Sequence, residues 1–272
     1  MKAFTRSVFV TAFFCGAFAA NATSVLYSNL PSPLPYDGWS HAFEATSSTE
    51  FGGLVTLATA GDDLTGATVL MSNWAPKSLW TSYGDATGYI VPMTLNIYNV
   101  GAGNTVGSVL ATDTVNALIR WKPEATGCDT MDGYNPGDGG CYHGFITPVS
   151  FKFGYEKLPG QVIFGLSFNT TDYGNPPNHA AGPYDSLNFA LSSSSPTAGS
   201  NPLPDTAYVN TTWAGFYTDG GAGGVGTFRQ DTGWSPYGAG AIELTGTPEP
   251  TTCILLGGGL LAMSLIRRRR RA

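Results

Sequence analysis

The sequence lacks the short motifs of the common hydrolases. It contains neither G-x-S-x-G nor H-E-x-x-H, and its three histidines, His41, His143 and His179, each stand alone in a loop-like context. A serine or zinc hydrolase of those classes would place such residues at fixed spacing. Distant residues can still assemble a site, so a glycosidase with two carboxylates is the enzymatic alternative. We expect a protein that is not an enzyme.

Basic residues are scarce between the two ends of the chain. Seven of the 13 Lys and Arg residues lie in the terminal segments, so residues 23–246 hold six basic against 18 acidic side chains, a net charge of −12. A surface this acidic repels nucleic acid and anionic lipid. We therefore expect no nucleic-acid partner.

A dinucleotide site is not expected either. Residues 221–226 match G-x-G-x-x-G in form, but that motif needs a strand before it and a helix after it. The residues that follow, 227–234, have no helical apolar spacing. We interpret the segment as a glycine-rich turn.

Amphipathic helices of useful length are also missing, and strand patterns dominate. In residues 93–98 and 149–153 every second side chain is apolar, as in a half-buried strand. Gly, Pro, Asn and Asp separate these runs. The sequence predicts an all-β domain over residues 23–246, an antiparallel β-sandwich of which a jelly roll is one version. The expected strands are Leu54–Ala58, Ala67–Met71, Met93–Tyr98, Ser108–Ala111, Val115–Trp121, Ile146–Phe153, Val162–Phe168, Leu187–Leu191, Tyr208–Tyr217 and Ala241–Leu244.

Three stretches are too rich in Pro, Ser and Gly to be strands: residues 123–143, 172–186 and 192–206. Loops of this length are often functional. The first of them holds Cys128 and Cys141, whereas the other two cysteines lie in the terminal segments. In an exported protein the natural pairing is a Cys128–Cys141 disulfide.

Acidic residues gather inside this cysteine loop, which has no basic residue. Hard oxygen ligands on a glycine-rich, cross-linked loop suit Ca²⁺, although the spacing does not match an EF-hand loop and solvated carboxylates are the simpler interpretation. The candidate calcium ligands are Asp129, Asp132 and Asp138.

Tryptophan is abundant, with six residues in the chain. Exposed aromatic rings on a β-sandwich can stack on the apolar C–H face of a sugar, whereas buried ones build the core. Two pairs flank short loops and are our candidates for a carbohydrate-binding platform, with the core as the alternative: Trp74 and Trp80, and Trp234 and Tyr237.

The first 22 residues have the pattern of a secretory signal peptide. Lys2 and Arg6 precede an apolar run, and residues 20–22 offer a small-x-small cleavage site. We therefore expect export across the inner membrane, with Thr23 as the new N-terminus.

The other end carries a second signal. Residues 251–266 are uncharged, and five arginines, Arg267, Arg268, Arg269, Arg270 and Arg271, follow at once. A helix of that length is about 24 Å long, short of the ~30 Å apolar core of a bilayer. The arginines would keep the tail end cytoplasmic. The sequence predicts a single, weakly anchored C-terminal transmembrane helix.

Together with Pro248, Glu249 and Pro250, this tail resembles the PEP-CTERM sorting signal of Gram-negative bacteria over residues 247–272. The resemblance implies processing near the motif by exosortase, a membrane-embedded transpeptidase, and transfer to the cell surface or exopolysaccharide matrix. Together with the missing hydrolase motifs and the tryptophan pairs, it leads us to expect a structural or carbohydrate-binding, non-catalytic protein. A permanently anchored envelope protein is the alternative.

Overall fold

A computed structural model describes residues 23–125, 127–128, 133–135, 139–211, 226–236 and 239–247, with the backbone alone at Tyr134, Asn135 and Tyr155. The expected signal peptide, the sorting motif, the apolar helix and the arginine cluster lie outside these residues. Within the described part, no helix is long and apolar enough to span a bilayer.

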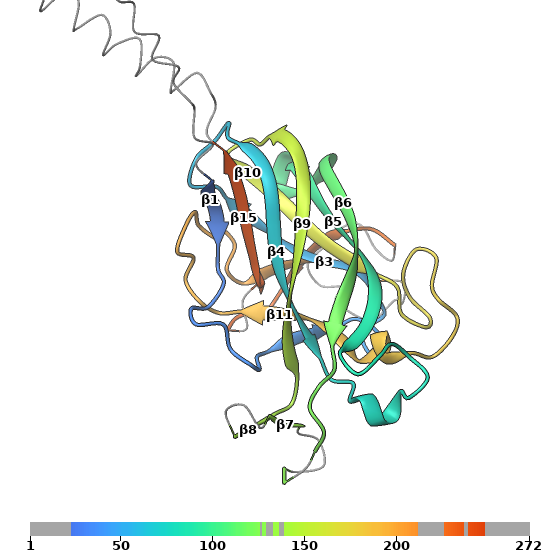
Figure 1. Cartoon of the computed structure of the whole chain (residues 1–272). Helices are drawn as coiled ribbons and strands as arrows, with labels where there is room; N and C mark the ends of the chain where they lie inside the picture. Colours follow the sequence, from blue (N-terminus) through green and yellow to red (C-terminus); the bar gives the residue numbers. More distant parts are fainter. Residues whose placement is uncertain are drawn as a thin grey trace, which may run out of the picture. The chain divides into compact units, whose positions relative to one another are not determined.

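The described residues form two large sheets and a small hairpin (Figure 1). Every pairing between the named strands is antiparallel. The seven-stranded sheet has the order β1 (Ser24–Ser28), β15 (Ile242–Thr247), β4 (Asp63–Asn73), β11 (Leu187–Ser192) and β14 (Ala239–Gly240); in addition β2 (Ser40–Ala42) pairs with β11, and β9 (Phe145–Lys157) with β4. The six-stranded sheet has the order β13 (Arg229–Thr232), β12 (Thr206–Thr211), β3 (Ser48–Thr56), β10 (Gln161–Phe168), β5 (Gly88–Val100) and β6 (Val106–Arg120).

Side-chain alternation explains why these segments are strands. Met93, Leu95 and Ile97 of β5 are fully buried, while the polar residues between them face outward. Core residues of both sheets belong to one continuous apolar cluster, so the sheets pack face to face. The predicted all-β, sandwich-like fold is therefore confirmed for the described residues.

The prediction of two strands at 108–111 and 115–121 is wrong, because β6 runs unbroken from Val106 to Arg120. The polar residues between them suggested a break. Instead, Thr112 Oγ1 donates to Asn96 Oδ1 (2.8 Å), and Thr114 and Thr94 share a 2.8 Å hydrogen bond across to β5. Cross-strand hydrogen bonds of this kind stabilise an outward-facing strand surface.

The chain passes repeatedly from one sheet to the other. Strand β3 lies in the six-stranded sheet, β4 in the seven-stranded, β5 and β6 in the six-stranded, β9 in the seven-stranded and β10 in the six-stranded sheet. At one side the edge strands β6 and β9 meet: Lys152 N donates to Asp113 Oδ2 (2.8 Å) and Arg120 N to Thr147 Oγ1 (3.4 Å). These bonds join the sheets where β6 and β9 would otherwise be open edges.

The stretch 123–143 is not all loop. It contains the hairpin β7 (Gly133–Asn135) and β8 (Gly140–Tyr142), which extends from the end of the sandwich (Figure 1). The disulfide between Cys128 and Cys141 is confirmed, with an S–S length of 2.05 Å. The stretches 172–186 and 192–206 are connections as predicted, apart from the short 3-10 helix η3 (Pro183–Ser186) and the strand residues Ser192 and Thr206. The other two 3-10 helices are η1 (Lys77–Leu79) and η2 (Ala102–Asn104).

Candidate functional site

A pocket of about 630 Å³ opens on the outer face of the seven-stranded sheet. Its position follows from alternation in β11: Leu187 and Phe189 point into the core, so Asn188 between them points outward. The size is within the usual range for small-molecule sites. We call it the indole pocket and define it by Asp37, Trp39, Ser40, Trp74, His143 and Asn188.

Trp39 is the exposed aromatic wall of the indole pocket. Its side chain is 67 % exposed, although its backbone is fixed by a 2.7 Å hydrogen bond from Leu191 N to Trp39 O. Burying an indole normally stabilises a fold, because it removes a large apolar area from water. An indole ring left exposed on a segment that is hydrogen-bonded to β11 is therefore a candidate binding feature.

Trp74 is the half-buried tryptophan of the same pocket. Its ring stacks on that of His143, with the centroids 5.8 Å apart and the planes 6° from parallel. In the amide orientation that satisfies its neighbours, Asn188 Oδ1 accepts from Trp74 Nε1 (3.1 Å) and Ser40 Oγ (3.0 Å). The polar edge of the indole is thus held by the sheet.

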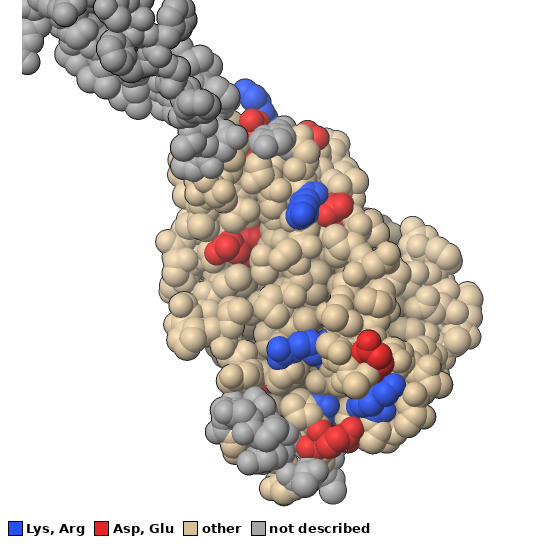
Figure 2. Space-filling view, viewed as in Figure 1, with Lys and Arg blue, Asp and Glu red and all other residues tan. Residues whose placement is uncertain are grey.

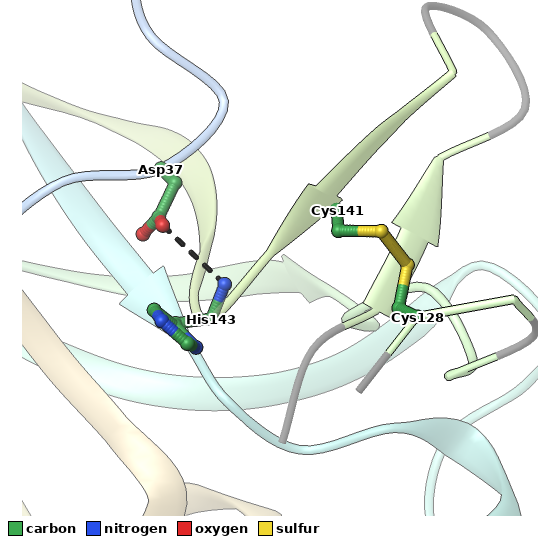
Figure 3. Close-up of a disulfide and its surroundings, with 4 residues drawn as sticks. All are labelled: Asp37, Cys128, Cys141 and His143. Carbon is green, nitrogen blue, oxygen red and sulfur yellow. Dashed lines mark hydrogen bonds between the residues drawn. A yellow bond between two sulfur atoms is a disulfide. The ribbon is translucent and has the colours of Figure 1, made fainter. Parts of the chain in front are cut away.

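Asp37 ties two walls of the pocket together. Its carboxylate accepts hydrogen bonds from the backbone N–H groups of Gly38 (2.6 Å), His143 (3.3 Å) and Gly144 (3.3 Å). Figure 3 shows the bond to His143. Glycine at position 144 leaves room for the wall, since a Cβ there would lie 2.1 Å from Ser72 Oγ and 3.0 Å from Trp74 Nε1, and these side chains would have to move.

The disulfide braces the same wall. Cys141 lies two residues before His143, so the cross-link to Cys128 restrains the strand that delivers His143 to the pocket (Figure 3). On the other side, the Tyr36 ring packs on Tyr142 (5.4 Å between centroids), and Ile146 N donates to Tyr36 O (2.9 Å). The segment before Trp39 is therefore attached to β8 and β9.

The four predicted carbohydrate residues do not form one platform. Trp74 lies in the indole pocket, whereas Trp80 packs edge-on against Tyr83 (5.6 Å) and does not line the pocket. Trp234 is only 8 % exposed, packs on Phe51 and donates from Nε1 to Asp231 Oδ2 (2.7 Å). It offers no ring face to a ligand, which corrects its assignment to a binding surface. Tyr237 lies outside the described residues.

Sequence reasoning missed the other residues that define the pocket: Asp37, Trp39, Ser40, His143 and Asn188. One signal was present for Trp39, which sits between Gly38 and Ser40 after a polar, proline-rich segment. A tryptophan in such surroundings has few apolar neighbours to bury it. Asn188 and His143 gave no comparable signal.

The described part of the chain offers no metal site, and its neighbouring carboxylates lie outside the indole pocket: burial and the nearby carboxylates of Asp185 and Asp172 raise the pKa of Glu44. No group of three His, Cys, Asp or Glu side chains there could hold a metal ion. Asp129, Asp132 and Asp138 lie outside it, so the calcium site stays a prediction. Among the described residues that line the indole pocket, Asp37 is the single carboxylate.

Buried ionisable groups also lie away from the indole pocket: His41 faces the core between the sheets, and Glu50 lies on the outer face of the six-stranded sheet. Burial lowers the pKa of His41 to about 3. Burial also raises the pKa of Glu50, which accepts hydrogen bonds from Tyr98 Oη (2.6 Å) and Asn96 Nδ2 (3.1 Å). These groups do not line the indole pocket. Both pKa shifts reflect the removal of these groups from water.

The chain has no significant match among protein-family models, curated proteins or solved structures.

Proposed function

We propose that this is an exported, non-catalytic protein of the cell surface or exopolysaccharide matrix that binds carbohydrate in the indole pocket. The observation that carries the proposal is the 67 % exposed Trp39 ring beside the stacked Trp74–His143 pair in a pocket of about 630 Å³. A sugar has an apolar C–H face and a hydroxyl rim. The aromatic walls of the pocket match the C–H face. Ser40 and Asn188, which also line the pocket, are polar groups that can bond the hydroxyl rim.

The scaffold is consistent with this role, and we infer that it is a jelly roll. Within the larger sheets, eight strands have the orders β1-β15-β4-β9 and β3-β10-β5-β6. The alternation of the chain between the sheets produces these orders, which are those of a double Greek key. Jelly rolls occur in lectin domains.

Export and processing are proposed from the sequence. The signal peptide over residues 1–22 and the PEP-CTERM resemblance over 247–272 would place the domain outside the inner membrane. The Cys128–Cys141 disulfide supports this, because such bonds persist in oxidising compartments. Intact-mass analysis of the surface protein tests it: processing by an exosortase removes the residues after the Pro248-Glu249-Pro250 motif, whereas a permanently anchored protein retains them.

Pull-down on insoluble and gel-embedded polysaccharides tests the binding function. Trp39→Ala should weaken retention about tenfold or more, since aromatic anchors dominate binding energy. Trp80→Ala is the matched control, because it removes a half-buried tryptophan outside the pocket. Equal retention of the wild type and Trp39→Ala would refute carbohydrate binding at this pocket.

A hydrolase acting on polysaccharide is the alternative. A glycosidase of the usual kind needs two carboxyl groups across the sugar, and the described lining supplies only Asp37, which is bonded to three backbone N–H groups. Release of reducing ends by the wild type and its loss in Asp37→Asn would favour this alternative.

A further inference from the structure

A second pocket, of about 470 Å³, lies near the other end of β11. We call it the serine pocket and define it by Ser192–Ser195, Ser200, Asn201 and Ser235. Ser193, Ser195 and Ser200 are exposed, so their hydroxyl groups face solvent. Ser192 is instead part of the wall, because its Oγ donates to Asn29 O (2.5 Å).

The serine pocket differs from the indole pocket in chemistry. Its described lining consists of hydroxyl, amide and proline side chains around the Tyr27 ring, and none of these residues carries a charge at neutral pH. Hydroxyl and amide groups both donate and accept hydrogen bonds. They match a neutral ligand rich in hydroxyl groups and offer no counter-charge to an anion or a cation.

The two pockets lie on one face of one strand. Asn188 in the indole pocket and Ser192 in the serine pocket are four residues apart on β11, so their side chains point the same way about 13 Å apart. Between them Ala190 belongs to a small apolar cluster on which Leu30 packs, and the bond from Leu191 N to Trp39 O brings the Trp39 backbone alongside. The surface from one pocket to the other is therefore short and apolar.

Charge narrows the class of ligand further. The domain carries a net charge of −12, which disfavours acidic polysaccharides. On the face shown in Figure 2, Lys, Arg, Asp and Glu side chains are scattered among uncharged residues and form no cationic patch. A neutral glycan fits both pockets and the surface around them.

We infer that the two pockets are subsites for one neutral glycan chain. Its sugars carry equatorial hydroxyl groups, because the axial C–H bonds then form the apolar face that stacks on an indole ring. One sugar stacks in the indole pocket, and a sugar further along the chain is hydrogen-bonded in the serine pocket. The inference rests on the proposed function at the indole pocket. Its consequence is that affinity grows with the length of the glycan, because the second contact is made at high effective concentration.

Isothermal titration with cellobiose and cellohexaose tests the inference on the exported domain with its disulfide intact. The wild type should bind cellohexaose at least tenfold more tightly than cellobiose. Ser195→Leu and Ser200→Leu should each remove most of that difference while leaving cellobiose affinity unchanged. Ser108→Leu, an exposed serine on β6, is the matched control and should behave as the wild type.

The outcomes separate the inference from the function on which it rests. Equal affinity for the two sugars, or an unchanged length dependence in both serine variants, overturns the second subsite and leaves the indole pocket in place. Retention on polysaccharide without cellohexaose binding overturns the neutral, equatorial ligand class. If no polysaccharide is retained either, the proposed function itself fails.

Discussion

The two faces of strand β2 place aromatic residues in opposite roles. His41 points inward, stacks on Phe51 (4.2 Å between centroids) and lies beside Trp234 (5.5 Å). Ser40 points outward into the indole pocket, next to exposed Trp39. A single residue step along an extended strand moves a side chain from dry core to solvent. Residue type alone therefore does not tell an exposed tryptophan from a buried one.

The largest expected effect is the difference in stability between Trp234→Ala and Trp39→Ala. Trp234→Ala removes a buried ring and the bond to Asp231, and should lower the free energy of unfolding by about 3–5 kcal/mol. Trp39→Ala should change it by less than about 1 kcal/mol, because the ring is exposed. Urea denaturation measures both. A similar loss of stability in the two variants would contradict the claim that Trp234 stabilises the core and Trp39 does not.

Removal of the disulfide should weaken ligand binding at the indole pocket. Cys128→Ser with Cys141→Ser opens a short loop and should destabilise the domain by about 3 kcal/mol in the chain-entropy picture. It also releases the strand before His143, so glycan affinity at the indole pocket should fall several-fold, as titration would show. The near-ultraviolet circular dichroism signal of the buried aromatic residues, among them Phe51 and Trp234, should be retained. Unchanged affinity would show that the brace does not position His143.

Lowering the pH should reduce the free energy of unfolding through His41, which packs against Phe51 and Trp234 in the core. Folded His41 stays neutral down to about pH 3, whereas in the unfolded chain it takes up a proton near pH 6.5. The unfolded state therefore binds more protons, and stability is lost as the pH falls from 6.5. The loss should be about 2–3 kcal/mol by pH 4.5.

The matched variants isolate this effect. His41→Gln should lack that part of the pH slope in urea denaturation, while His143→Gln, in the outer pocket, should keep it. The comparison with wild type is needed because the raised pKa of Glu50 gives a slope of opposite sign just above pH 4.5. Parallel slopes in wild type and His41→Gln would contradict the assignment.

The smallest effect is expected at Tyr27, which borders the serine pocket from below. Its hydroxyl is buried and has no hydrogen-bond partner among the described residues. Removing an unsatisfied hydroxyl relieves a desolvation cost, so Tyr27→Phe should raise the free energy of unfolding by up to about 1 kcal/mol. Cellohexaose affinity should not change, because the hydroxyl is inaccessible. Destabilisation would reveal a partner for the hydroxyl.

The sheets were predictable from sequence because their alternation is local. The run 93–98 and the run 146–153 both lie within observed strands, and the turn at Pro159-Gly160 separates β9 from β10. The continuity of β6 was not predictable, since the Thr112 and Thr114 bonds that support it require knowledge of the neighbouring strand. Local pattern indicates a strand but not its partner.

The pocket was predictable only in part. Trp74 could be named because it borders a short polar loop, but its neighbours come from segments far apart in the chain: Asp37, His143 and Asn188. Trp234 borders an equivalent loop and is buried, because Phe51 and His41 converge on it from other strands. Burial is set by packing that one short segment does not encode.

The place of the last strand has a consequence for how the domain matures. β15 lies between β1 and β4, with Thr245 opposite both Val25 and Gly66. Among the described strands, β1 therefore has no ladder partner until the final residues of the domain have been made. A nascent chain that ends before β15 leaves both β1 and the facing edge of β4 unpaired, so this sheet closes last. Completion of the sheet is thereby tied to completion of the polypeptide.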